Sequence, residues 1–276
     1  MEMAQVTARA MVEMDLAILA DCAVPPAAIC VGMAGADRAE AAQTVADLMQ
    51  RLGRGSRILV VNDALIALVA GAGQQTGIVI ISGTGAIVYG RTQDGRAARS
   101  GGWGYLIGDE GSAYWMGLRA LAAVVRAADG RGPATALTDG VLAHFGVDSP
   151  GALVPSLYGA TVPRTQIAML GPAIHAACAM NDVVANAIVD AAGDELCTGA
   201  EAVTRRLGLR DEAFAFVLSG GVFRAVPRLV TAIAPCLAAI APNASVTQLT
   251  EEPARGAVAL ALAEARGGAT IPRYEA

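Results

Sequence analysis

The sequence contains no lysine, so all 20 of its basic side chains are arginines. A Walker-type phosphate loop needs a lysine to neutralise the terminal phosphates, and Schiff-base chemistry needs a lysine amine. Both are excluded. Histidine is also scarce, since only His144 and His175 are present. This scarcity argues against a histidine-rich metal site and against a Ser-His-Asp hydrolase.

Cysteine is sparse and scattered. No two of the five cysteines have the two-residue spacing that brings a pair of thiolates onto one metal ion. We therefore expect reduced, buried thiols and no metal site. The five are Cys22, Cys30, Cys178, Cys197 and Cys236.

Long apolar runs are absent, although the mean hydropathy is high at +0.48. The longest run, residues 229–242, is too short to span a bilayer and contains Pro235. Glu2, Glu13 and Asp15 lie where a signal peptide has a basic start and an apolar run. We expect no transmembrane helix and a cytoplasmic location.

The remaining composition describes a globular protein that binds a small molecule. With 276 residues and 54% hydrophobic content, the chain can form the core of one large domain or two ordinary ones. The formal net charge of -5 argues against a nucleic-acid partner, because binding a phosphate backbone requires a concentrated basic surface.

Helix and strand patterns alternate in the first part of the chain. Apolar spacing predicts a helix over residues 1–20 and a strand over 28–31, followed by a helix over 40–52 and a strand over 57–61. Two strands joined by a crossover helix imply a parallel sheet. The fold class predicted is therefore α/β.

A run of closely spaced strands begins at Gly77. Residues 77–82, 86–91 and 96–99 read as strands separated by glycine turns, which predicts an antiparallel meander at the start of a new domain. Helices and two further strands follow. The predicted helices cover 112–129, 165–180, 182–207, 223–240 and 253–264, and the predicted strands cover 214–218 and 245–250.

Asp63 follows a predicted buried strand and precedes an apolar helix. Its carboxylate could cap that helix by accepting a backbone N–H. Alternatively, it could act as a general base that deprotonates a substrate hydroxyl for attack on phosphorus. Position alone leaves both interpretations open.

Gly83, Thr84 and Gly85 form a turn between two predicted strands. Glycines in such a turn often serve backbone geometry alone. They could instead let backbone N–H groups and the Thr84 hydroxyl approach a polyphosphate. Gly220 and Gly221 raise the same question, because they form either an ordinary strand-to-helix turn or a flat surface for a nucleotide.

Residues 101–112 concentrate glycines around one indole and one acid pair. Asp109 could cap the helix that follows, and Trp103 could belong to the core. The density of glycines exceeds what a connection requires. A carboxylate beside an indole also suits a sugar, whose hydroxyls would bond to Asp109 and whose apolar face would rest on Trp103.

Taken in order, these motifs resemble the N-acetylglucosamine kinase and BadF-type ATPase family of the actin, Hsp70 and hexokinase superfamily. The resemblance covers nearly the whole chain, and residues 101–115 are its most specific part. The matching segments are residues 31–38, 62–64, 81–85, 101–115, 219–222 and 253–257.

The resemblance implies an ATP-dependent amino-sugar kinase that phosphorylates the 6-position of glucosamine or N-acetylglucosamine. It implies two ribonuclease H-like domains, residues 1–74 with a C-terminal helix over 253–267, and residues 75–252. Asp63 would be the catalytic base, and Gly83, Thr84, Gly85, Gly220 and Gly221 would bind ATP. The sugar would contact Gly102, Trp103, Gly104 and Asp109.

One departure concerns the start of the chain. Relatives begin with a strand, a glycine-rich phosphate turn and further strands that do not precede Met1 here. That turn would carry a carboxylate for magnesium. The first domain is therefore expected to be truncated at its N-terminus, with an incomplete Mg²⁺ site and little or no activity.

Two alternatives remain open beside the kinase. The chain could be a non-catalytic sugar- or nucleotide-binding regulator that keeps the cleft. It could also be an ATPase activator of a CoA-linked reductase or dehydratase, but such activators hold an iron-sulfur cluster through clustered cysteines. The resemblance further suggests a homodimer.

Overall fold

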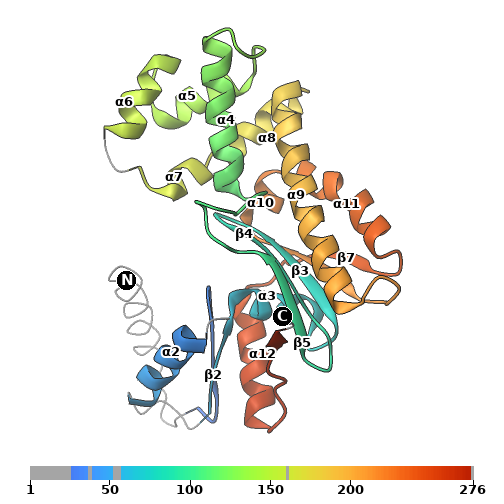
Figure 1. The fold of residues 1–276 in the computed structure, drawn as a ribbon. Coiled ribbons are helices and arrows are strands. Elements are labelled where there is room, and N and C mark those ends of the chain that lie inside the picture. The colour runs from blue at the N-terminus through green and yellow to red at the C-terminus, as the bar shows by residue number, and fades with distance from the viewer. Residues whose placement is uncertain (1–25, 37–38, 52–56, 160–161, 275–276) are drawn as a thin grey trace. The chain divides into compact units, whose positions relative to one another are not determined.

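The computed structural model describes residues 26–36, 39–51, 57–159 and 162–274, and Figure 1 labels the helices and strands that they form. The helix predicted over residues 1–20 lies outside these ranges. Contacts within the chain define two compact units. The first combines Met1–Asn62 with Ala257–Ala269, and the second combines Asp63–Gly256 with Thr270–Ala276. The predicted division between residues 74 and 75 stays a prediction.

The first unit contains a parallel strand pair with a crossover helix, as predicted. Strand β1 (Ile29–Met33) pairs with β2 (Ile58–Asn62) in a register that runs from Ile29 with Ile58 to Met33 with Asn62. Helix α2 (Ala39–Arg51) covers the pair with the buried side chains of Val45 and Met49. These two residues form a small core.

The second unit is built on a six-stranded mixed sheet in the order β7-β6-β3-β4-β5-β8. The meander predicted from residue 77 is confirmed, because β3, β4 and β5 pair antiparallel in sequence. Strands β6, β7 and β8 join it in parallel. The bounds are β3 Gly77–Ser82, β4 Ala86–Arg91, β5 Arg96–Gly101, β6 Ala215–Ser219, β7 Ser245–Gln248 and β8 Arg273–Tyr274.

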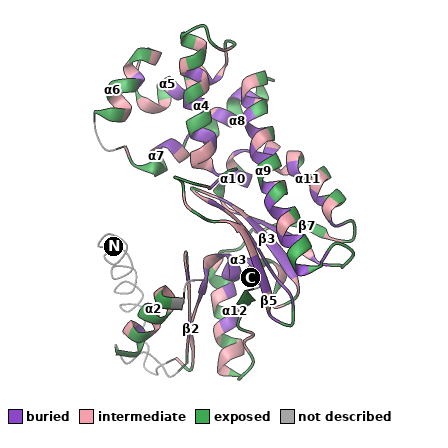
Figure 2. Cartoon of the chain, viewed as in Figure 1, coloured by how far each residue is buried: buried purple, intermediate pink, exposed green. Residues whose placement is uncertain are grey.

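Helices cover both faces of this sheet. Side chains alternate between the faces of β3, so Ile78 and Ile80 join the large helical core, and Figure 2 shows this strand buried. Helix α3 (Asp63–Ala72) packs against β3, β4 and β6, and its Gly71 lies against Val217. The other helices are α4 Ala113–Ala128, α5 Leu137–Phe145, η1 Pro150–Ala152, α6 Leu153–Tyr158, α7 Arg164–Ala168, α8 Gly171–Ala179, α9 Val183–Leu207, α10 Gly221–Ala225, α11 Arg228–Ile240 and α12 Ala254–Ala265.

Two predicted helices are each divided in the structure. The helix expected over 165–180 consists of α7 and α8, and Pro172 stands in the first turn of α8. The helix expected over 223–240 is interrupted before α11 at Pro227. Proline lacks a backbone N–H and favours a helix start, so both prolines begin new helices.

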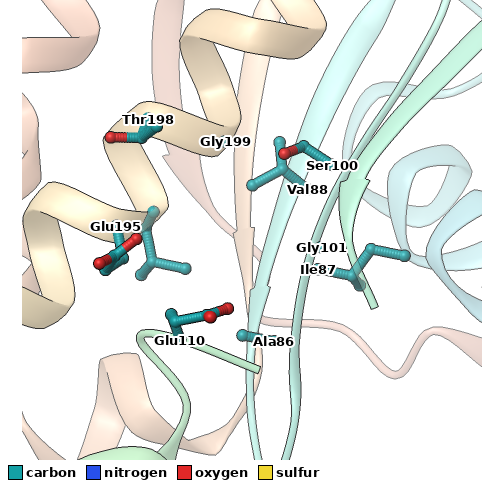
Figure 3. Close-up of a pocket in the computed structure, with 10 residues that line it drawn as sticks. Ala86, Ile87, Val88, Ser100, Gly101, Glu110, Glu195, Thr198 and Gly199 are labelled. Atoms are coloured by element: carbon teal, nitrogen blue, oxygen red, sulfur yellow. The ribbon is translucent and has the colours of Figure 1, made fainter. Parts of the chain in front are cut away.

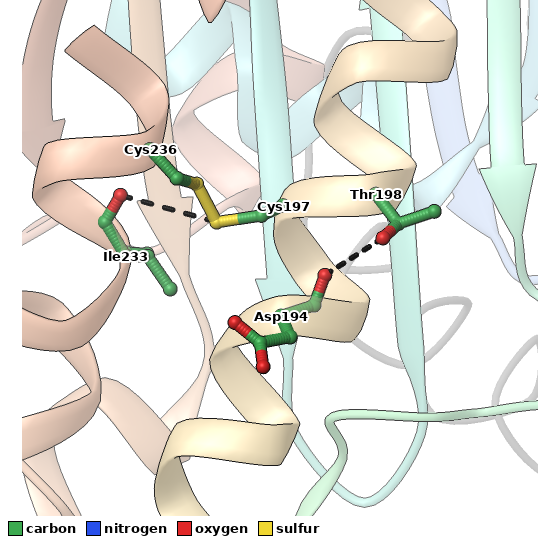
Figure 4. Close-up of a disulfide and its surroundings, with 5 residues drawn as sticks. All are labelled: Asp194, Cys197, Thr198, Ile233 and Cys236. Carbon is green, nitrogen blue, oxygen red and sulfur yellow. Dashed lines mark hydrogen bonds between the residues drawn. A yellow bond between two sulfur atoms is a disulfide. The ribbon is translucent and has the colours of Figure 1, made fainter. Parts of the chain in front are cut away.

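A disulfide joins Cys197 of α9 to Cys236 of α11 (Figure 4), so the expectation of reduced thiols is wrong for this pair. The Cα atoms are 6.3 Å apart, and the helices are packed closely where Gly193 lies against Ile233. The pair is separated by 39 residues, so only the helix packing reveals it. Cys30 remains a free thiol, and burial raises its pKa to about 11.

No helix among the described residues combines the length and hydropathy needed to cross a bilayer.

Candidate functional site

The glycine turn at residues 82–85 connects β3 to β4 and is fixed to the loop that precedes α4. The buried hydroxyl of Ser82 donates to the carbonyl oxygen of Gly111 at 2.7 Å. The N–H of Ala113 donates to the carbonyl oxygen of Gly83 at 2.8 Å. Thr84 at the tip of the turn is exposed. The turn is therefore anchored at both sides, and the Thr84 side chain is accessible.

Asp109 lies directly against this turn in a left-handed backbone conformation, with φ 62°. Its carboxylate accepts backbone hydrogen bonds from Ala86 and Gly104. Burial raises the pKa of Asp109, whereas these two hydrogen bonds and the charge of Arg164 lower it. A methyl group on Gly85 would lie 2.8 Å from a carboxylate oxygen, so the close approach requires glycine. The carboxylate is held in a defined place.

Asp109 does not cap α4, so that interpretation is wrong. Ser112 is the N-cap, because its hydroxyl accepts the N–H of Trp115 at 3.1 Å. The backbone turns sharply between Asp109 and Ser112, where the N–H of Ser112 donates to the carbonyl oxygen of Asp109. This turn leaves the Asp109 carboxylate facing β4 and the glycine loop. A left-handed non-glycine residue that is buried and polar is a common feature of ligand sites.

The aromatic side chains of the glycine loop lie at the surface. Trp103 is 61% exposed, so its interpretation as a core residue is wrong. The guanidinium of Arg99 lies 4.5 Å from the centre of the Trp103 ring. The ring of Tyr105 meets Tyr114 edge-on at 5.5 Å, and the guanidinium of Arg164 lies 4.3 Å from the Tyr105 ring. The loop therefore presents supported aromatic faces to a ligand.

Gly102 and Gly104 flank Trp103 and shape its loop. The N–H of Gly102 donates to the carbonyl oxygen of Ala86 at 3.1 Å, on the strand that follows the 82–85 turn. The N–H of Gly104 donates to the Asp109 carboxylate. The bond from Gly102 joins the two glycine-rich segments, and the bond from Gly104 holds the Asp109 side chain within its own segment.

Gly220 and Gly221 bring a third turn to the same place. The φ of Gly220 is 112°, and a methyl group there would overlap the carbonyl oxygen of Ser82. Only glycine therefore permits this contact between the two turns. Gly221 is exposed and has no atom within 4 Å of the position of an added Cβ. Open surface thus lies beside the 82–85 turn.

Asp63 is the first residue of α3 and follows β2, as the sequence predicted. Its Oδ1 accepts the N–H of Ala64 at 3.0 Å, and the residue is half-buried. A carboxylate at a helix N-terminus interacts favourably with the helix dipole. The role of Asp63 as general base stays a prediction.

A polar pocket of about 110 Å³ lies between α9 and strands β4 and β5 (Figure 3). It has room for a few water molecules. The carboxylates of Glu110 and Glu195 and the hydroxyls of Ser100 and Thr198 line it. Asp109 and Trp103 are not among its lining residues. The pocket therefore lies beside the predicted sugar residues and does not contain them.

Metal-binding side chains do not gather in the described part of the chain. No group of three or more histidine, cysteine, aspartate or glutamate side chains there is placed to hold a metal ion.

The structure brings together three of the four predicted segments, namely 82–85, 101–112 and 219–222. Sequence reasoning found them because each combines glycines with a strand end. It missed Arg99 and Arg164, whose contacts with Trp103 and Tyr105 join residues 4 and 59 positions apart. It also missed Glu195, which carries no local motif.

Comparison with characterised proteins gives two relatives that cover most of the chain. An N-acetylmuramic acid/N-acetylglucosamine kinase from Clostridium acetobutylicum is 37% identical over 237 residues, which is 86% of this chain and 78% of the relative. An N-acetyl-D-glucosamine kinase from Dictyostelium discoideum is 34% identical over 241 residues, which is 85% of this chain and 75% of the relative.

Solved structures show the same fold. A proposed N-acetylglucosamine kinase from Chromobacterium violaceum has 28% identity and a TM-score of 0.67, and the match covers 86% of this chain and 77% of that one. A second, from Porphyromonas gingivalis, has 23% identity and a TM-score of 0.62, with 83% and 75% covered, and supports the fold alone. The predicted α/β, actin-like ATPase fold is confirmed. The BadF/BadG/BcrA/BcrD ATPase family pattern matches residues 25–261, and the chain belongs to this family.

Proposed function

We propose that this chain transfers the γ-phosphoryl group of ATP to the 6-hydroxyl of an N-acetylated amino sugar. The observation that carries the proposal is the junction of three glycine-rich segments around the fixed carboxylate of Asp109. Relatives that phosphorylate N-acetylglucosamine support the substrate class.

The sugar would bind at the loop before α4. The Asp109 carboxylate already accepts two N–H groups, and its remaining acceptor capacity suits sugar hydroxyls. The exposed Trp103 ring offers an apolar face for the sugar ring. Gly102 and Gly104 allow close approach of the backbone. Together these groups would fix the orientation of the sugar.

The nucleotide would bind at the two other turns. Gly83, Thr84 and Gly85 would hold the phosphates through backbone N–H groups and the accessible Thr84 hydroxyl. Gly220 and Gly221 would lie near adenosine, since Gly221 faces open space. The contact between Gly220 and Ser82 would then fix the position of the adenosine site relative to the phosphate site.

In the proposed reaction, Asp63 accepts the proton of the sugar 6-hydroxyl. The oxygen forms a bond to the γ-phosphorus, and the bond from that phosphorus to the bridging oxygen breaks as ADP leaves. Magnesium, where bound, neutralises phosphate charge. For this proton transfer, the carboxylate of Asp63 must be ionised and must lie within hydrogen-bond distance of the sugar 6-hydroxyl.

The test combines ADP release with calorimetry for N-acetylglucosamine, N-acetylmuramic acid and glucose. We expect ADP release with the N-acetylated sugars, which would show that the expectation of little or no activity is wrong. In the Asp63→Asn variant the rate should fall by about 10²- to 10⁴-fold with little change in sugar affinity, because the variant loses only the base. Absence of both sugar binding and ADP release would overturn the proposal. Sugar binding without ADP release would indicate a regulator.

We also propose the two-domain division predicted from the resemblance, residues 1–74 with the helix over 253–267 and residues 75–252, and a homodimer. Analytical ultracentrifugation tests the latter, and a monomer at all accessible concentrations would contradict it.

A further inference from the structure

Ser82 ends β3 with a polar side chain on an apolar face of the sheet. Side chains alternate along a strand, so Ser82 lies on the same face as Ile78 and Ile80, which belong to the helical core. None of the three is exposed to solvent. A buried hydroxyl needs a hydrogen-bond partner, and that of Ser82 donates to the carbonyl oxygen of Gly111 at 2.7 Å. Ser82 therefore connects β3 to the loop that precedes α4.

Gly111 also packs against α9. Its φ is 80°, and a methyl group there would lie 2.7 Å from the Leu196 side chain. Gly111 follows Asp109 by two residues, and the N–H of Ser112 donates to the carbonyl oxygen of Asp109 at 3.1 Å. The hydrogen bond from Ser82 thus holds one end of a closed turn, and the proposed sugar ligand Asp109 lies at its other end.

The backbone of Ser82 contacts the third glycine turn. A methyl group on Gly220 would overlap the Ser82 carbonyl oxygen, so the two backbones leave no room for a side chain. The next residue, Gly83, accepts the N–H of Ala113 at the start of α4, at 2.8 Å. The three segments proposed to bind the ligands therefore meet at Ser82, whose hydroxyl bonds to the sugar loop and whose carbonyl contacts the adenosine turn.

We propose that Ser82 is a positioning residue that sets the place of the sugar loop relative to the two nucleotide turns. Because its side chain is fully buried, it acts through Gly111 and does not touch either substrate. The inference rests on the proposed function and adds to it a residue on which the alignment of sugar with ATP depends. Phosphoryl transfer requires this alignment, whereas each ligand can bind to its own segment without it.

Ser82→Ala tests this inference on the full chain through a comparison of kcat with KM. We expect kcat with N-acetylglucosamine to fall by about 10- to 100-fold, because a displacement of about 1 Å between reacting groups has an effect of this size. The KM for ATP and the calorimetric dissociation constant of the sugar should stay within about threefold. A rise in either value with unchanged kcat would overturn the inference, because it would assign Ser82 to the binding of that ligand.

The calorimetric stoichiometry gives the fraction of the chain that is folded and able to bind sugar. The measured rate is divided by this fraction, so that kcat refers to folded protein alone. A loss of rate that disappears after this correction would also overturn the inference, because it would reflect misfolding.

Thr92→Val is the matched control. Thr92 is also buried, and its hydroxyl donates to Asp94 in the turn after β4, at the opposite end of the strand from Ala86. Both variants lose a hydrogen bond from a buried hydroxyl, so both should lower the urea unfolding midpoint. Thr92→Val should keep kcat within about twofold. An equal loss of kcat in the two variants would contradict the inference, since lower stability alone would explain it.

Ser82→Thr keeps the hydroxyl donor and should retain kcat within about threefold of the unmodified chain. This variant also tests the inference if Ser82→Ala does not fold. A folded Ser82→Thr chain whose kcat falls by tenfold or more, about as far as is expected of Ser82→Ala, would show that the hydroxyl does not position the loop.

The two proposals fail in different ways. If the unmodified chain phosphorylates N-acetylglucosamine and Ser82→Ala has the same kcat, the inference is wrong and the proposed function stands. If the unmodified chain releases no ADP with any N-acetylated sugar, the proposed function is wrong and the inference falls with it.

Discussion

The carboxylate of Asp109 is positioned before any ligand binds. Two backbone N–H groups, from Ala86 and Gly104, hold it, and Gly85 leaves the space that it occupies. Burial opposes its ionised form, and the hydrogen bonds offset part of that cost. A ligand group fixed in this way need not lose side-chain freedom on binding, so it should bind sugar hydroxyls more tightly than a mobile aspartate would.

Gly85→Ala should displace this carboxylate. The added methyl group would lie 2.8 Å from an Asp109 oxygen, and we expect sugar affinity to fall about tenfold and the free energy of unfolding to fall by about 1–3 kcal/mol. Gly83→Ala is the control, because its nearest atom would be 4.0 Å away. Calorimetry without nucleotide and urea unfolding measure both quantities. Unchanged affinity and stability in Gly85→Ala would show that Asp109 is free to move.

For single residues, the sequence predicted which ones lie together but not which hydrogen bonds and packing contacts position them. The glycine-rich surroundings of Asp109 predict a site there, yet one of its two hydrogen bonds comes from Ala86, the first residue of β4. Trp103 was open to two interpretations, because indoles occur both in cores and at binding surfaces. Only the packing of the loop decides that its ring is exposed.

Helix α9 links several parts of the second unit. Its Leu196 and Ala192 lie against Gly111, which ends the loop that carries Asp109. Cys197, which follows Leu196 in α9, forms the disulfide with Cys236 of α11. The disulfide therefore restrains the same helical turn that supports the proposed sugar loop.

Loss of the disulfide should lower stability by about 2–4 kcal/mol, because it closes a segment with a separation of 39 residues and restricts the unfolded chain. Cys236→Ser should show this loss in denaturant unfolding, and a reductant should have no further effect on it. The Cys30→Ser control keeps the disulfide and should still be destabilised by reductant. An unmodified chain with the same unfolding midpoint in oxidising and reducing buffers would contradict the prediction.

Elements were easier to predict than single contacts. Strands β3, β4 and β5 follow from apolar runs between glycine turns, and the pairing of β1 with β2 follows from the crossover helix. Helices α5 and α6 were not predicted. The sequence did not identify Pro172 and Pro227 as helix boundaries. A proline in an apolar helical pattern either bends a helix or begins one, and the pattern alone does not distinguish the two.

The family could be predicted for the whole molecule because its motifs occur in order at the ends of strands. How the buried apolar residues are divided between the two units could not be predicted. The second unit buries a continuous apolar cluster between the sheet and its helices, whereas the buried residues of the first unit's cluster are Val45 and Met49 in the described part of the chain. That difference depends on which helices meet in space, and helical periodicity alone does not specify it.

The unequal cores should produce unequal local stability. In β1 every residue is only partly buried, whereas Ile78, Val79 and Ile80 of β3 are fully buried. Local opening costs less where fewer apolar contacts break. In native-state hydrogen exchange, the hydrogen-bonded amides of β1 and β2 should therefore exchange at least about tenfold faster than those of β3 and β4. The two-residue strand β8 provides an internal reference for rapid exchange at a sheet edge. Equal protection of the two strand pairs would contradict this prediction, because it would mean that the larger buried apolar core of the second unit does not raise the cost of local opening there.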